Sequence, residues 1–129
     1  MPGWEVRCHC TGVGKVLLAY QSEEMLTKLA KSPGLEHLTP RTVTTLPQLK
    51  KELERIRERG YAVDNEEAVD GLRCVAAPLF DHTGRAVAAF SVAGPATRLT
   101  QERILEIALL VCETSREISC RLGFRPRAA

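Results

Sequence analysis

The apolar pattern of this chain changes its period near Gly60, and this change limits the possible folds more than any other feature. Before Gly60, apolar residues recur three and four positions apart, which is the spacing of amphipathic helices. Beyond it, residues 72–80 and 86–93 have the two-residue period of strands, and residues 81–84 join them as a hairpin. The chain is therefore expected to place a small antiparallel sheet after its first helices.

Start and stop signals divide the other residues into helices and one more strand. Ser22, Thr45 and Thr100 have side chains suited to helix N-caps, and Gly60 ends the helix that follows Thr45. A short strand is expected at 61–64. The expected helices cover about residues 13–20, 23–30, 46–59 and 101–122. Antiparallel strands segregated from helices define an α+β domain.

The expected sheet is small for the core it has to carry. Three strands are few for a domain of this size, which suggests that further strands of the fold precede Met1. Pro78 also removes one hydrogen bond of the strand ladder. Its strand is therefore expected near an edge of the sheet, or bent at this residue.

Composition agrees with one globular domain over residues 1–129. The chain is 44% hydrophobic and 26% charged, values that argue against a disordered or fibrous protein. No apolar run approaches the roughly 18 residues of a membrane-spanning helix, and the N-terminal residues lack the apolar stretch of a signal peptide. We therefore expect a cytoplasmic protein whose five cysteines are thiols rather than disulfides.

The charge of the chain gives little reason to expect DNA binding. Eighteen Lys and Arg residues stand against 16 Asp and Glu residues, for a formal net charge of +2, and a near balance creates no strong field around nucleic acid. The mixed run at 50–59 is expected to be a solvated helix face, with pairs such as Lys50 with Glu54 and Arg55 with Glu58.

Five segments carry a family resemblance when taken together and in order. They are CHCTGVGKVLLA at 8–19, LTPRT at 38–42, RGYAVDNEE at 59–67, GLRCVAAP at 71–78 and AFSVAGP at 89–95. In this combination the chain resembles the effector-binding domain of IclR-type transcriptional regulators over residues 3–124, almost its whole length.

The resemblance implies a GAF-like or profilin-like fold in the cytoplasm that binds a small metabolite and needs no cofactor. In the family this domain controls a winged helix-turn-helix domain that lies before it in the sequence. That DNA-binding domain, the linker helix and the first strands of the effector-binding domain have no counterpart in the 129 residues. The chain is therefore expected not to bind DNA itself and to form a homodimer or tetramer, as such domains associate.

The resemblance also implies a binding pocket for a small carboxylate. Its residues are Gly12, Val13, Asp64, Leu72, Cys74, Ser91 and Ala93. The amides of Gly12 and Val13 would bind the acid group, since free N–H groups at a helix start suit an anion. Ala93 stands where close relatives have a second serine, which suggests a less polar or larger effector.

Other interpretations of the same residues rest on the sequence alone. Asp64 also fits a solvated or turn-capping carboxylate, Cys74 a small buried hydrophobe, and residues 11–14 the close approach of a packed helix. In a pocket, Asp64 would repel a bound carboxylate unless it accepts a ligand hydroxyl or carries a proton. Ser91 alternates with Ala89 and Ala93 on one strand face, so its hydroxyl can reach the same cavity.

Two other functions fit some of these residues. Cys74 as nucleophile, His9 as base and Asp64 as orienting group would make a hydrolase, although burial without a positive neighbour disfavours a thiolate. A pure oligomerisation module, with side chains filling the pocket, is the other alternative. Cys8, His9 and Cys10 do not predict a metal site, because neighbours in an extended segment point to opposite faces and no second cluster completes four ligands.

Overall fold

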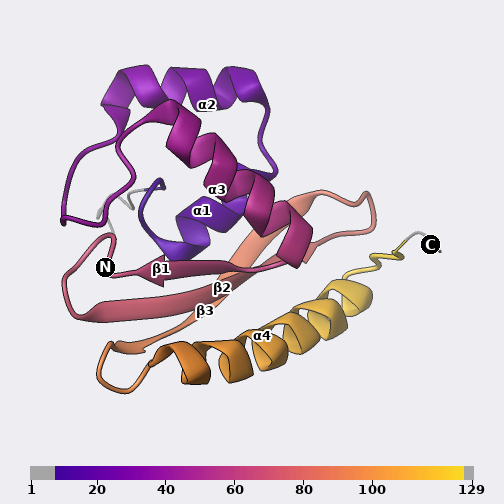
Figure 1. The fold of residues 1–129 in the computed structure, drawn as a ribbon. Helices are drawn as coiled ribbons and strands as arrows, with labels where there is room; N and C mark the ends of the chain where they lie inside the picture. Colours follow the sequence, from indigo (N-terminus) through magenta and orange to yellow (C-terminus); the bar gives the residue numbers. More distant parts are fainter. Residues whose placement is uncertain (1–7, 127–129) are drawn as a thin grey trace, which may run out of the picture.

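The computed structural model describes residues 8–126, apart from the side chains of residues 32 and 33 (Figure 1). Its helices are α1 (Gly12–Ala19), α2 (Glu23–Leu29), α3 (Leu46–Arg59) and α4 (Gln101–Arg121), with one π-helical turn, η1 (Ala30–Gly34). Its strands are β1 (Ala62–Asn65), β2 (Leu72–Phe80) and β3 (Ala86–Pro95). The expected α+β class is confirmed.

The helices begin where the sequence predicts because of their N-cap side chains. The hydroxyls of Thr11, Ser22, Thr45 and Thr100 each accept a hydrogen bond from the backbone N–H three residues later. Gly60 ends α3 in the left-handed conformation, with a φ of 87°. The chain after α2 departs from the expected helix end near Ala30, since it continues through the π-helical turn η1.

The three strands form one antiparallel sheet in the order β1-β2-β3. Asp64 of β1 lies opposite Cys74 of β2, which lies opposite Ala93 of β3. The next row on the same face holds Ala62, Ala76 and Ser91. Helices α1, α2 and α3 lie on one side of the sheet and α4 on the other (Figure 1).

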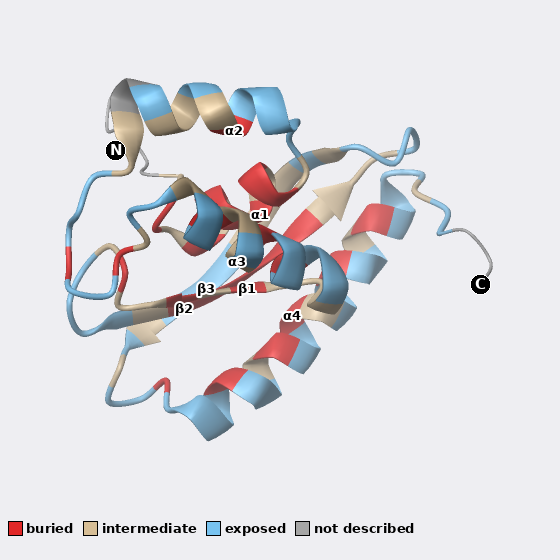
Figure 2. Ribbon diagram, turned by 45° about the horizontal axis from the view of Figure 1, so that its top comes forward, coloured by how far each residue is buried: buried red, intermediate tan, exposed pale blue. Residues whose placement is uncertain are grey.

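Each face of the sheet has its own apolar core, and Figure 2 shows the buried positions of α4 on the side of that helix that faces the sheet. The core of the first face combines buried side chains of α1, α2 and α3 with Ala62 and Ala76. On the second face, α4 packs Ile104, Ala108 and Val111 against Val75 and Ala77. The sheet is therefore the middle layer of three.

Pro78 lies in the central strand rather than in an edge strand, and β2 becomes irregular beside it. The register with β3 shifts between Leu79 and Phe80, and this agrees with the expected bend. Two hydroxyls of α4 form hydrogen bonds with the main chain of β2 here. Ser115 donates to the carbonyl of Pro78, and Ser119 Oγ accepts from the N–H of Phe80 at 3.0 Å.

The two edges of the sheet differ in how they are covered. Along the outer side of β1, Lys15 Nζ donates to Val63 O at 2.7 Å and Glu67 Oε2 accepts from Asn65 N at 3.0 Å. Within residues 8–126, β3 has a partner strand only on its β2 side. The β1 edge is thus closed by side chains, whereas the β3 edge is open.

Candidate functional site

The sheet brings most of the predicted site residues onto one face. Asp64, Cys74 and Ala93 form one cross-strand row, Ser91 lies in the next, and Leu72 lies two residues before Cys74 on the same side of β2. This is the face that α1 covers. Strand alternation predicted that Leu72 shares a face with Cys74 and that Ser91 shares a face with Ala93. The placement of Asp64 beside them came from the family resemblance.

The start of α1 lies directly on this row. A Cβ atom on Gly12 would come within 2.5 Å of Cys74 Sγ and 3.2 Å of Ala76 Cβ, so α1 can approach β2 this closely only at a glycine. Val13 is half-buried, and its side chain packs into the first core. The close approach of a packed helix, expected from the sequence alone, is therefore present, and it also places the first amides of α1 beside Cys74.

Asp64 is buried, with 3% of its surface exposed. Its Oδ1 accepts from the N–H of Glu67 at 2.9 Å, and its Oδ2 lies 4.0 Å from Cys74 Sγ. It therefore caps the turn after β1, whereas the expectation of a solvated carboxylate is wrong. Burial, as the largest cause, raises the pKa of Asp64 to about 6.

The thiol of Cys74 lacks the surroundings of a nucleophile. Burial, with the neighbouring Asp64 carboxylate as the second cause, raises the pKa of Cys74 to about 11. His9, the candidate base, is buried, and its Nε2 lies 2.7 Å from the carbonyl oxygen of Glu36. At neutral pH the sulfur is a neutral thiol.

The remaining predicted residues of the sheet are open to solvent. On β3, Ser91 and Ala93 are exposed, and Leu72 at the start of β2 is 37% exposed. The site face thus has a buried half, formed by Asp64 and Cys74 under α1, and an exposed half along β3. A ligand on this face would touch both halves.

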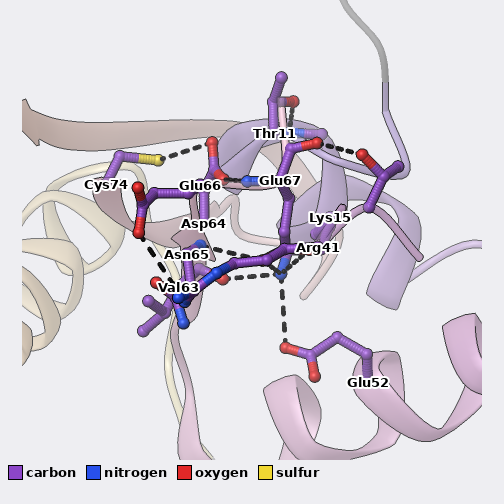
Figure 3. A network of polar contacts seen from close by, with 12 residues as sticks. Thr11, Lys15, Arg41, Glu52, Val63, Asp64, Asn65, Glu66, Glu67 and Cys74 are labelled. Carbon is purple, nitrogen blue, oxygen red and sulfur yellow. Dashed lines mark hydrogen bonds and ion pairs between the residues drawn. The ribbon is translucent and has the colours of Figure 1, made fainter. Parts of the chain in front are cut away.

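A buried ion pair beside the site was missed in the sequence analysis (Figure 3). Lys15 is 1% exposed, and its Nζ lies 3.0 Å from Glu67 Oε2. The same Nζ reaches Val63 O and, at 3.5 Å, Glu52 of α3. The signal was a single charge in the apolar segment GVGKVLLA, matched by an acidic turn at 65–67 that appeared to be solvated.

The charged run of α3 is paired differently from the prediction. Lys50 lies 3.8 Å from Glu23 of α2, and Arg55 lies 3.7 Å from Glu52. Glu52 is part of the Lys15 network and mostly buried rather than on a solvated face. Helical spacing alone does not reveal a partner on another element.

No group of three or more His, Cys, Asp or Glu side chains within residues 8–126 is placed to hold a metal ion. The five cysteines, all within the described residues, form no disulfide. In the same part of the chain, no helix combines the length and apolarity needed to cross a membrane.

Comparisons with known proteins agree on one class, that of bacterial transcriptional regulators. A family model described as "Bacterial transcriptional regulator IclR C-terminal" matches residues 2–120. The HTH-type transcriptional repressor AllR of Salmonella typhi is 45% identical over 127 residues, which are 98% of this chain and 47% of AllR. The chain belongs to the IclR family and corresponds to its C-terminal regulatory domain. It spans about half the length of the curated relatives it matches, which are described as HTH-type transcriptional repressors.

Solved structures of the family have the same fold. The Thermotoga maritima IclR structure is 44% identical with a TM-score of 0.86, and the match covers 95% of this chain and 49% of that one. A double mutant of the PobR inducer binding domain from Acinetobacter, in complex with 3-hydroxybenzoic acid, is 26% identical with a TM-score of 0.81. That match covers 87% of this chain and 65% of the PobR chain.

Proposed function

We propose that this chain is the effector-binding domain of a cytoplasmic IclR-type regulator and binds a small carboxylate on the sheet face beside α1. Binding there would control a DNA-binding domain of the parent protein outside these 129 residues. The observation that carries the proposal is the row Asp64, Cys74 and Ala93 lying under the first turn of α1.

The acid group of the ligand would bind at the amides of Gly12 and Val13. The first N–H groups of a helix have no partner within the helix, and the first turn of α1 contains no acidic residue. An anion at a helix N-terminus gains about 0.3 to 1 kcal/mol when exposed and up to about 2 kcal/mol when partly buried. Asp64, whose pKa is raised to about 6, can take up a proton as the anion binds.

The other end of the ligand would decide its identity. Asp64 and Ser91 can exchange hydrogen bonds with a hydroxyl or keto oxygen, while Leu72 and Ala93 accept an apolar body. The PobR relative supports this chemistry, because its 3-hydroxybenzoic acid combines an acid group, an aromatic ring and a hydroxyl. The proposed ligand class is therefore a small carboxylate with a hydroxyl, keto or aromatic group.

A pair of ligands and a pair of variants test this proposal. A thermal-shift screen of small carboxylic acids first selects two binders that differ by one hydroxyl, because a specific ligand stabilises the folded state. Calorimetry then compares Asp64→Ala with the exposed control Asp70→Ala. We expect Asp64→Ala to weaken the binding of the hydroxyl-bearing acid more than that of its partner, by about 1 to 3 kcal/mol.

Equal losses of binding for both acids would mean that Asp64 is only structural. A screen without any binder would favour a pure oligomerisation module.

A further inference from the structure

A cavity lies at the β1 edge, away from the site just proposed. It has a volume of about 740 Å3 and is lined by the segment 41–43, the C-terminal half of α3, β1 and the start of α4. Val63 of its wall packs into the α4 core, whereas Asp64 points to the α1 face of the sheet. Strand β1 therefore separates the two sites.

Positive charge is in excess around this cavity. Four of the lining residues are Arg41, Arg55, Arg59 and Arg73. The acidic residues of the lining are Glu52 and Glu67. The lining residues therefore carry four positive and two negative charges, a net charge of +2 at the wall of the cavity.

Two of these arginines are held loosely enough to turn toward a ligand. Arg41 lies 3.8 Å from Glu66, and its side chain is 53% exposed. Arg55 lies 3.7 Å from Glu52 and is 66% exposed. Arg59 and Arg73 are fixed instead, because Arg59 donates to the carbonyl of Tyr61 and Arg73 to that of Leu99, at 2.8 and 2.9 Å.

Two buried polar atoms of the cavity wall lack hydrogen-bond partners among the described residues. They are Arg73 Nε, a donor, and Asn65 Oδ1, an acceptor. Buried polar atoms are nearly always hydrogen-bonded, so a pair of unsatisfied atoms in one wall calls for a partner. Both atoms have less than 1 Å2 of exposed surface, so a ligand would reach them only after a small movement of the two side chains. An anionic oxygen would then satisfy Arg73, and a hydroxyl group would satisfy Asn65.

We propose that this cavity binds a small dianion carrying a hydroxyl group, of the hydroxydicarboxylate class, as a second ligand site of the domain. The two carboxylates match the net charge of +2 of the lining residues, with Arg41 and Arg55 at the open side and Arg73 at the buried side. Glu67 connects this site to the first, because its side chain binds Lys15 while its backbone N–H donates to Asp64.

Calorimetry with malate, succinate and acetate at constant ionic strength tests the proposal on the whole chain. We expect saturable binding of malate, weaker binding of succinate and none of acetate. The variant Arg41→Gln/Arg55→Gln should bind malate at least about tenfold more weakly, since it loses two charge-assisted contacts. The matched control Arg116→Gln/Arg121→Gln removes the same charge from exposed α4 positions outside the cavity and should bind malate as the wild type does.

Two further variants separate this site from the first one. Asn65→Ala should remove the preference for malate over succinate, whereas Ser91→Ala, on the exposed half of the first site, should leave malate binding at this cavity unchanged. The absence of saturable malate binding would overturn the proposal, and so would equal losses in both double-arginine variants. Malate binding lost only in Ser91→Ala would assign the ligand to the α1 face and contradict a second site.

Discussion

Gly12 shows how much one residue decides at this site. Alanine is favoured over glycine inside a helix by about 1 kcal/mol, yet its Cβ would lie 2.5 Å from Cys74 Sγ. Overpacking of this kind costs about 1 to 3 kcal/mol, so the contact outweighs the helix propensity. The glycine keeps the first amides of α1 against the sheet face where Asp64 and Ser91 lie.

Asp64 makes the stability of the domain depend on pH. Its pKa rises from 3.8 to about 6 on folding, chiefly because of burial, so the folded state binds more protons than the unfolded state between these values. The contribution of Asp64 to the free energy of unfolding is therefore fully present below about pH 4 and is lost as the pH rises through about 6. At neutral pH the charged carboxylate destabilises the fold.

Asp64→Asn should remove this dependence while keeping the oxygen that accepts from Glu67. We expect the variant to be more stable than the wild type at pH 7, by about 1 to 3 kcal/mol, and equally stable near pH 4. Urea unfolding across this pH range measures both values. Asp70→Asn, at an exposed position, is the control and should follow the wild type. A wild-type curve without a slope between pH 4 and 6 would contradict the assignment.

At the scale of elements, the parts of the fold set by local chemistry were predictable and those set by distant partners were not. The N-caps at Ser22, Thr45 and Thr100 act within one turn, and β2 has the predicted bounds, Leu72–Phe80. The role of Lys15 was missed because its partners lie on β1, on the following turn and on α3. Strand β3 runs two residues beyond the predicted end, to Pro95, because β2 continues to pair with it.

The candidate site follows the same division. The register of the three strands puts Asp64, Cys74 and Ser91 on one face, as the family resemblance implied, and their role as ligand contacts stays a prediction. The burial of Asp64 and the cavity at the β1 edge depend on how α1, α3 and α4 pack around the sheet. No spacing within one segment contains that information.

Lys15 joins α1 to three other parts of the fold, and its removal should therefore weaken the whole domain. Lys15→Met leaves Glu67 buried without its cation and Val63 O without its donor, so we expect a loss of about 3 to 5 kcal/mol. The double variant Lys15→Met/Glu67→Gln should recover part of this loss, because no buried charge then remains unpaired. Lys28→Met removes an exposed pair with Glu24 and serves as the control in chemical denaturation. Equal stability of Lys15→Met and wild type would mean that the pair contributes little.

The two edges of the sheet differ across the whole molecule: the β1 edge is covered and the β3 edge is exposed. Side chains cover the outer main-chain groups of β1, whereas β3 has no partner strand on its outer side within the described residues. On the solvent side of α4, Leu105, Leu109 and Leu110 are between 61% and 74% exposed. Val87 and Val92 of β3 are also exposed. Exposed strand edges and apolar side chains of this extent favour association.

We therefore expect the chain to form a homodimer or larger assembly at tens of micromolar, with α4 in the interface. Light scattering should give a mass at least twice the 14.2 kDa of one chain. Leu109→Glu/Leu110→Glu should shift the protein toward the monomer with its circular dichroism unchanged, because two charges would lose their hydration in the interface. Val69→Glu, which charges an apolar position away from α4 that is 55% exposed, should leave the mass as in the wild type. A folded wild-type monomer at this concentration, or the same mass for the α4 variant as for the wild type, would exclude α4 as the interface.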